Sequence, residues 1–195
     1  MKKIFIALLT FVLMIIPIIT FADTTSTLKQ SSFKQNIVQL KDLPVMIENI
    51  KYTPNDSQVK KATYFVFDDK AKAEGVVYGF TNQNDLNVHL QNAVNERKKN
   101  IQNNTFVPQY IGWYSYFYQN ANFGGLSFFR DYDQSQLFFY NDRISSMQAG
   151  SNHNWTVMYW DINYGGEQLW VQSHNELSYV GSHWNDEISS IRVID

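Results

Sequence analysis

The stretch that decides the fold is Trp184-Asn-Asp-Glu-Ile-Ser-Ser190, close to the C-terminal end of the sequence. It has a counterpart upstream, Asn141-Asp-Arg-Ile-Ser-Ser146. A second signature precedes each copy: an aromatic residue, four further residues, a second aromatic residue and two glycines, at residues 118–125 and 159–166. Two signatures that occur twice in the same order predict a duplicated structural unit.

The spacing of the two copies differs slightly. The aromatic-glycine signatures lie about 41 residues apart and the Asn-Asp signatures about 44 residues apart. The second copy therefore contains about three extra residues, which we place in the loop around residues 173–175.

The repeat lies in the aromatic half of the chain. All five Trp residues fall at or after residue 112, where short β-prone runs alternate with clusters of Asn, Asp, Gly and Ser. This pattern predicts an all-β sandwich with tight turns. The predicted strands are 113–118, 126–129, 136–139, 155–159, 168–171 and 188–194.

The N-terminus has the pattern of a secretory signal peptide. Two lysines precede an apolar run over residues 4–19, and residues 20–22 place small side chains at the usual cleavage positions. The alternative is a retained membrane anchor, because the run is nearly long enough to span a bilayer. Pro17 and the small residues after it favour cleavage. We therefore expect residues 1–22 to be removed and the mature protein to be secreted, with no membrane span.

Two regions separate the signal peptide from the aromatic half. Residues 23–61 are polar and are interpreted as a linker or a loosely docked arm. Residues 62–105 predict a small β-β-α region, with strands at 63–67 and 75–80 joined by a turn, and a helix capped by Thr81 or Asn82. This region is too short to bury much apolar surface alone, so we expect it to pack on the downstream domain or on a partner.

Composition excludes several classes of function. The chain has no Cys, which excludes disulfides, a thiol nucleophile and a thiolate zinc site. Loss of the two signal-peptide lysines leaves a net charge of about −4, and carboxylates outnumber arginines in residues 112–195, so we expect no nucleic-acid partner. The four histidines lack zinc-ligand spacing, and we interpret them as surface or loop residues. No hydrolase motif is present. We expect a protein that is not an enzyme.

The repeated Asn-Asp-x-Ile-Ser-Ser segments offer oxygen atoms to a hard cation. Calcium binds six to eight such oxygens at about 2.3–2.6 Å, with water filling gaps. An extended, bent segment can turn its oxygens to one ion while Ile144 or Ile188 points into the core. One loop supplies too few ligands, so each site needs a carbonyl from elsewhere, and we expect it to come from the partner repeat. The alternative is that these polar side chains only cap turns.

Taken together, the two repeated signatures resemble those of the βγ-crystallin family over residues 112–195. The resemblance implies an all-β C-terminal domain in which two Greek key motifs form a β-sandwich, here preceded by a small α+β region and a signal peptide. Because microbial members of the family typically bind two calcium ions at the paired loops, it also implies two Ca²⁺ ions.

The resemblance implies a set of metal-binding residues in each copy. The first site would use Asn141, Asp142, Arg143 and Ser145, and the second would use Asn185, Asp186, Glu187 and Ser189. The family also uses the backbone carbonyl of the residue after the first aromatic of each signature, here Gln119 and Trp160. We expect Arg143 to weaken the first site, because its positive charge repels the ion.

These observations predict a secreted, non-enzymatic, monomeric calcium-binding protein whose ions stabilise its fold. The alternative is a secreted protease inhibitor or toxin-like protein on the same fold, for which the loop at residues 173–175 is the one candidate. The absence of Cys disfavours an inhibitor, because inhibitors of this type tend to have disulfides. Adhesion to glycans through exposed Tyr and Trp is a third interpretation, so the partner is left open between a protease and a cell-surface component.

Overall fold

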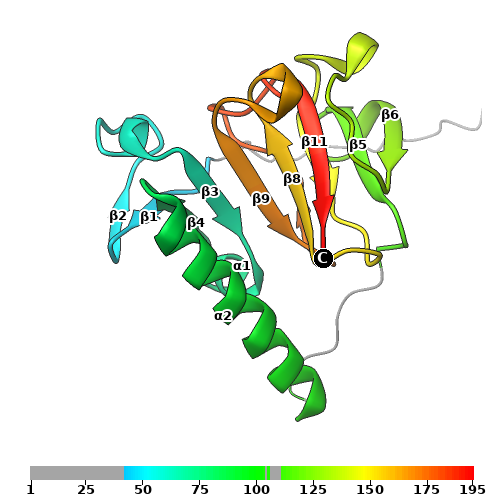
Figure 1. Cartoon of the computed structure of the whole chain (residues 1–195). Coiled ribbons are helices and arrows are strands. Elements are labelled where there is room, and N and C mark those ends of the chain that lie inside the picture. Colours follow the sequence, from blue (N-terminus) through cyan, green and yellow to red (C-terminus); the bar gives the residue numbers. More distant parts are fainter. Residues whose placement is uncertain (1–41, 104, 106–110) are drawn as a thin grey trace, which may run out of the picture. The chain divides into compact units, whose positions relative to one another are not determined.

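The structure, a computed structural model, describes residues 42–103, 105 and 111–195 (Figure 1). The predicted signal peptide and the first part of the predicted polar arm lie outside the described residues. Within these residues, no helix is long and apolar enough to cross a membrane. All of them belong to one compact unit over residues 38–195.

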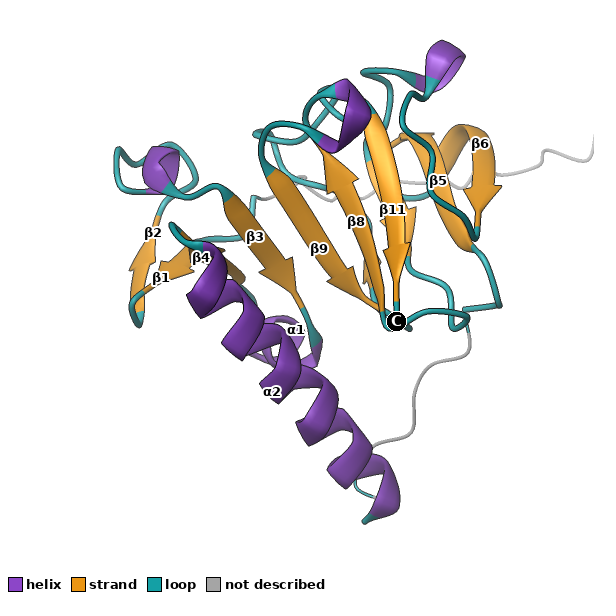
Figure 2. Cartoon of the chain, in the orientation of Figure 1, coloured by secondary structure: helices purple, strands orange, loops and turns teal. Residues whose placement is uncertain are grey.

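The first part of this unit contains four strands and two α-helices (Figure 2). They are β1 (Val45–Ile47), β2 (Ile50–Tyr52), the 3₁₀ turn η1 (Val59–Lys61), β3 (Tyr64–Phe67), α1 (Asp69–Glu74), β4 (Val77–Phe80) and α2 (Gln83–Gln102). As predicted, Asn82 caps α2: its side chain accepts a hydrogen bond from the backbone N–H of Asp85.

The second part is all-β apart from two 3₁₀ turns. It consists of β5 (Ser115–Asn120), β6 (Gly124–Arg130), η2 (Phe138–Tyr140), β7 (Ser146–Gln148), β8 (Trp155–Tyr159), η3 (Ile162–Tyr164), β9 (Gln168–Gln172), β10 (Glu176–Leu177) and β11 (Ser190–Ile194).

The strands of the second part form two sheets that exchange strands between the repeats. β10, from the second repeat, pairs with β7 in the sheet ordered β10-β7-β5-β6. In return Gln134, from the first repeat, forms a bridge with Ile191 in β11 of the other sheet. Each repeat therefore contributes one strand position to its partner's sheet, as expected of two interlocked Greek key motifs.

The small α+β region extends one of these sheets. β3 runs parallel to β9, with Tyr64 opposite Gln168 and Phe67 opposite Val171. The resulting seven-stranded sheet has the order β11-β8-β9-β3-β4-β1-β2 (Figure 1). The predicted packing on the downstream domain is confirmed, and it occurs through backbone hydrogen bonds as well as side chains.

The core lies between the two sheets and includes the isoleucine of each Asn-Asp signature. Ile144 and Ile188 are both fully buried, which confirms the predicted inward direction of these side chains. They pack in one continuous cluster with Phe117, Met147 and Ile191. Burial of such side chains supplies about 25 cal/mol per Å² of apolar surface removed from water.

Three local predictions differ from the structure. The predicted strand 136–139 is instead the turn η2, because Phe138 adopts a positive φ of 52° that a strand does not allow. The predicted turn after β3 is the helix α1, which Asp68 caps by accepting from the N–H of Ala71. Residues 42–61, expected to be part of a linker or arm, contain β1, β2 and η1 and join the sheet.

Candidate metal centre

The two Asn-Asp signatures adopt the same local conformation. Asp142 and Asp186 both have a positive φ, 54° and 61°, a region that Asp and Asn tolerate better than most residues. In each copy the preceding Asn donates from Nδ2 to the Asp Oδ2, at 2.6 Å in the first copy and 2.7 Å in the second. The duplication in sequence is therefore a duplication in geometry.

The second Ser of each signature fixes the neighbouring hairpin. Ser146 Oγ donates to the carbonyl of Asn120 at 2.7 Å and accepts from the N–H of Phe123 at 3.0 Å. Ser190 makes the matching pair with the carbonyl of Asp161 at 2.6 Å and the N–H of Tyr164 at 3.1 Å. These serines were not among the predicted site residues, although their repetition in the sequence marks them.

The glycines of the aromatic-glycine signature close the same hairpins. Gly125 and Gly166 have φ values of +75° and +72°. A Cβ at residue 166 would lie 2.8 Å from Asp161 Oδ2, so both the backbone and the available space require glycine. The hairpins in turn hold the residues after each first aromatic, Gln119 and Trp160, next to the Asn-Asp loops.

The loops of the two repeats face each other and are joined by reciprocal hydrogen bonds. The N–H of Asp142 donates to the carbonyl of Ile188 at 3.1 Å, and the N–H of Asp186 donates to that of Ile144 at 3.3 Å. The two predicted sets of ligands therefore lie on either side of one contact between the repeats.

This contact groups the predicted ligands across the repeats. Ser189 Oγ donates to Asp142 Oδ1 at 3.0 Å, so the first repeat's carboxylate lies beside the second repeat's hydroxyl. Ser145 Oγ instead donates to the carbonyl of Gln119 at 2.7 Å. The sequence grouped Ser189 with Asn185, Asp186 and Glu187, whereas its hydroxyl lies beside a carboxylate of the other repeat.

The remaining predicted ligands lie at the edges of these two clusters. Asn185 is half-buried, whereas Asp186 and Glu187 are exposed. Trp160 follows β8, and its N–H donates to the carbonyl of Glu167 at 3.0 Å. Arg143 is exposed, with its guanidinium 4.6 Å from the ring centroid of Phe139. A guanidinium has no acceptor atom, so Arg143 can bind a cation only through its carbonyl.

One oxygen of the first loop has no hydrogen-bond partner. Asn141 Oδ1 is the single buried side-chain N or O atom without one in the part of the chain that the structure describes. A buried amide oxygen without a partner is costly. A cation bound by the loop would satisfy it, so the ligand set fits a hard ion that prefers oxygen.

The described residues contain no group of three or more His, Cys, Asp or Glu side chains that could hold a metal. Three of the histidines each lie beside one carboxylate: His89 beside Asp68, His153 beside Asp195 and His183 beside Glu167. His89 is half-buried and also packs against the rings of Tyr78 and Phe80. It was expected at the surface, and the helix α2 instead turns it partly inward.

The extra loop of the second repeat is not presented to solvent. Ser173 is 7% exposed and Asn175 is 1% exposed. Arg97 of α2 donates to both the carbonyl and the hydroxyl of Ser173, at 2.6 and 2.8 Å, and also pairs with Asp69. The loop at residues 173–175 therefore anchors the α+β region to the β-sandwich.

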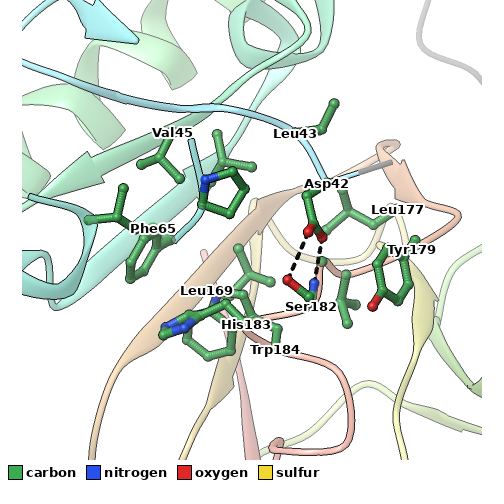
Figure 3. Close-up of a pocket in the computed structure, with 15 residues that line it drawn as sticks. Asp42, Leu43, Val45, Phe65, Leu169, Leu177, Tyr179, Ser182, His183 and Trp184 are labelled. Carbon is green, nitrogen blue, oxygen red and sulfur yellow. Dashed lines mark hydrogen bonds between the residues drawn. The ribbon is translucent and has the colours of Figure 1, made fainter. Parts of the chain in front are cut away.

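The α+β region also contacts the loop that leads into the second signature (Figure 3). The carboxylate of Asp42 accepts from the N–H of Ser182 at 2.6 Å and from its hydroxyl at 2.8 Å. These residues border a cavity of about 40 Å³ lined mainly by apolar side chains, including Phe65 and Trp184. A cavity of this size holds one or two water molecules at most, so it is a packing defect rather than a ligand site.

No protein-family model matches the chain, and no curated protein matches it. Solved structures do match. A βγ-crystallin from an archaeon is 34% identical, with 43% of this chain and 99% of that chain covered and a TM-score of 0.38. A βγ-crystallin domain from Flavobacterium johnsoniae is 30% identical, with coverage of 41% and 92% and a TM-score of 0.36.

A double mutant of clostrillin, solved in complex with nickel, is 27% identical, with coverage of 42% and 98% and a TM-score of 0.36.

The archaeal and the Flavobacterium johnsoniae relatives reach at least 30% identity over nearly the whole of their own length. This chain carries both sequence signatures twice, and the two copies share one geometry. The chain therefore belongs to the βγ-crystallin family.

Proposed function

We propose that this protein binds two calcium ions between the paired loops and that the ions stabilise its crystallin domain. One ion would be held by Asp142 and Ser189, with the amide oxygen of Asn141. The other would be held by Ser145 and the carbonyl of Gln119, with Asp186 from the facing loop. Carbonyls of Arg143, Trp160 and Glu187, the side chain of Asn185 and water would complete the two coordination spheres.

The observation that carries the proposal is the spacing of oxygens from different segments. Ser189 Oγ and Asp142 Oδ1 are 3.0 Å apart, and Ser145 Oγ and the carbonyl of Gln119 are 2.7 Å apart. Two oxygens bound to one calcium ion at about 2.4 Å are commonly about 3 Å apart. Small rotations of the two hydroxyls would therefore turn each hydrogen-bonded pair into a pair of ligands.

Bound calcium would supply positive charge, which would neutralise the carboxylates of Asp142 and Asp186. Each ion would also join the two repeats, because it would have ligands from both. Because ligand that binds only the folded state adds to its stability, the ions would contribute roughly 4 kcal/mol at a thousandfold excess over the dissociation constant. We propose a secreted protein without enzymatic activity. The proposed ligands hold an ion, and none of them is placed as a nucleophile or a general base.

The number of calcium ions bound per chain tests this proposal. Residues 23–195, which include the whole compact unit, should bind two calcium ions in a calorimetric titration. Asp142→Ala and Asp186→Ala should each remove one event and leave the other. Two unchanged events in both variants would reject the assigned ligands, and the absence of any event in the unmodified protein would reject calcium binding.

A further inference from the structure

The two repeats carry equivalent loops directly before their Asn-Asp signatures, at residues 137–140 and 181–184. Both loops close with the same backbone hydrogen bond, from the N–H of Tyr140 to the carbonyl of Leu137 at 3.0 Å, and from the N–H of Trp184 to the carbonyl of Gly181 at 3.1 Å. They occupy matching positions, but their surroundings differ.

The α+β region covers the loop of the second repeat. Asp42 holds Ser182 through two hydrogen bonds, and Phe65 packs against both His183 and Trp184 with ring centroids 5.6 Å apart (Figure 3). The side chains that this loop turns outward therefore have a partner within the chain.

The loop of the first repeat is uncovered, and it is the more apolar of the two. Phe138 is 72% exposed and Phe139 is 57% exposed. Phe138 is the most exposed large apolar side chain in the part of the chain that the structure describes. In Figure 1 this short yellow-green turn stands beyond the ends of β5 and β6. We name Phe138 and Phe139 the phenylalanine tip.

The tip is held rigidly in this exposed position. Leu137, directly before it, is buried, and its N–H donates to the carbonyl of Ser189 at 3.0 Å. The N–H of Asn141, directly after it, donates to the carbonyl of Phe138 at 3.1 Å. Phe138 itself has a φ of 52°, which is unfavourable for a bulky side chain. The backbone of the tip is thus fixed to both Asn-Asp loops, although both of its rings remain exposed.

The charge beside the tip would depend on the ions. The guanidinium of Arg143 lies on the Phe139 ring, while the neighbouring carboxylate of Asp142 offsets its charge. Two calcium ions bound beside Asp142 and Asp186 would more than offset those carboxylates and the exposed Glu187, so this end of an otherwise acidic domain would become positive around the two rings only with calcium. Exposed phenylalanines beside a cation fit the boundary between lipid headgroups and acyl chains, where apolar side chains insert and basic groups meet anionic headgroups.

We propose that the phenylalanine tip docks the protein onto an anionic lipid surface when calcium is bound. The calcium dependence rests on the proposed function. The partner is a lipid surface rather than a glycan, because the two most exposed side chains of the tip are phenylalanines, which offer a sugar no hydrogen-bonding group. Two rings and one guanidinium suit a deformable surface, in which they need no preformed pocket.

Vesicle sedimentation tests the inference. Residues 23–195 would be mixed with vesicles of phosphatidylcholine alone, or of phosphatidylcholine and phosphatidylglycerol in equal parts, in calcium or in chelator. Binding should occur only to the anionic vesicles in calcium. The double variant Phe138→Gly/Phe139→Ser should bind these vesicles roughly tenfold more weakly, or more weakly still, because binding scales with the apolar area inserted.

Two variants separate docking from folding. Phe138→Gly alone relieves the left-handed backbone, so it should unfold at the same or a higher temperature and still lose vesicle binding. Trp113→Ser removes another exposed aromatic, before β5 and at the opposite end of that strand from the Asn-Asp loops, and it should bind vesicles like the unmodified protein.

The outcomes distinguish this inference from the proposed function. Calcium uptake in the calorimeter without vesicle binding overturns the inference and leaves the calcium sites standing. Equal vesicle binding in calcium and chelator also overturns it. So does calcium-dependent self-association in solution that Phe138→Gly abolishes, since the tip would then bind a second copy of the chain. Absence of calcium uptake overturns both.

Discussion

Ser189 Oγ lies 3.0 Å from Asp142 Oδ1, although the two residues belong to different repeats. The hydroxyl of Ser145 makes a different contact, with the carbonyl of Gln119. In the proposed arrangement Asp142 and Ser189 would therefore bind the same ion, across the boundary between the repeats. This relationship decides which substitutions act on the same binding event.

Asp142→Ala and Ser189→Ala should weaken the same calcium-binding event. Because each removes a ligand from one ion, the loss in the double variant should be smaller than the sum of the two single losses. Ser145→Ala should weaken the other event and add independently to Asp142→Ala. Calorimetric titration of the unmodified protein, the three single variants and the two double variants checks this, and additive losses for Asp142 and Ser189 would restore a grouping within each repeat.

Gly166→Ala should destabilise the fold more than Gly75→Ala. Both glycines have a positive φ, +72° and +65°, so alanine costs about 1 kcal/mol in backbone strain at either position. A Cβ at residue 166 also meets Asp161 Oδ2 at 2.8 Å, whereas nothing lies within 4 Å of one at residue 75. We expect a total loss of roughly 2–4 kcal/mol for Gly166→Ala. Urea unfolding measures both, and equal losses would argue against a closely packed hairpin.

Asp42→Ala should weaken the contact between the α+β region and the loop at residues 181–184. The variant loses two hydrogen bonds to Ser182, which should lower the free energy of unfolding by about 1 kcal/mol, since the contact is exposed. Asp42→Asn keeps an acceptor for the backbone N–H and should retain most of that stability. A full loss in Asp42→Asn would show that the charge of Asp42 matters rather than its hydrogen bonds.

Stability should fall in alkali partly through Tyr78. Burial raises the pKa of Tyr78 above its ordinary value, and its hydrogen bond to Glu74 at 2.6 Å adds to the shift. The contribution of a group whose pKa is raised in the folded state is complete below its unfolded pKa, here about 10, and is lost as the pH rises beyond it. Tyr78→Phe should therefore lose less stability than the unmodified protein above about pH 10. If the melting temperatures of the two proteins fall equally as the pH rises above about 10, Tyr78 does not have this role.

Local features of the fold were predictable from the sequence, and long-range ones were not. The directions of Ile144 and Ile188 follow from repeated signatures, and the cap at Asn82 follows from its side chain. The parallel pairing of β3 with β9 and the contact of Arg97 with Ser173 join residues far apart in the sequence. The periodicity of the sequence does not reveal such contacts, because they depend on how the folded strands and helices pack against each other.

The candidate site was also predictable only in part. Repetition in the sequence identified the oxygen-bearing residues, but the pairing of Asp142 with Ser189 depends on how one repeat faces the other. The turn η2 was mistaken for a strand because Leu137, Phe138 and Phe139 are β-prone side chains. The left-handed backbone of Phe138 is imposed by hydrogen bonds on both sides of the turn, to Ser189 and from Asn141.

The most direct test of the calcium account is the thermal unfolding of residues 23–195 in millimolar calcium and in chelator, with magnesium as a control. The account predicts a melting temperature that rises with calcium concentration and does not respond equally to magnesium, because calcium accepts six to eight oxygen ligands whereas magnesium demands a smaller, octahedral site. An identical melting temperature in calcium and chelator would contradict it and leave the Asn-Asp-Ser-Ser segments as turn caps that join two Greek keys.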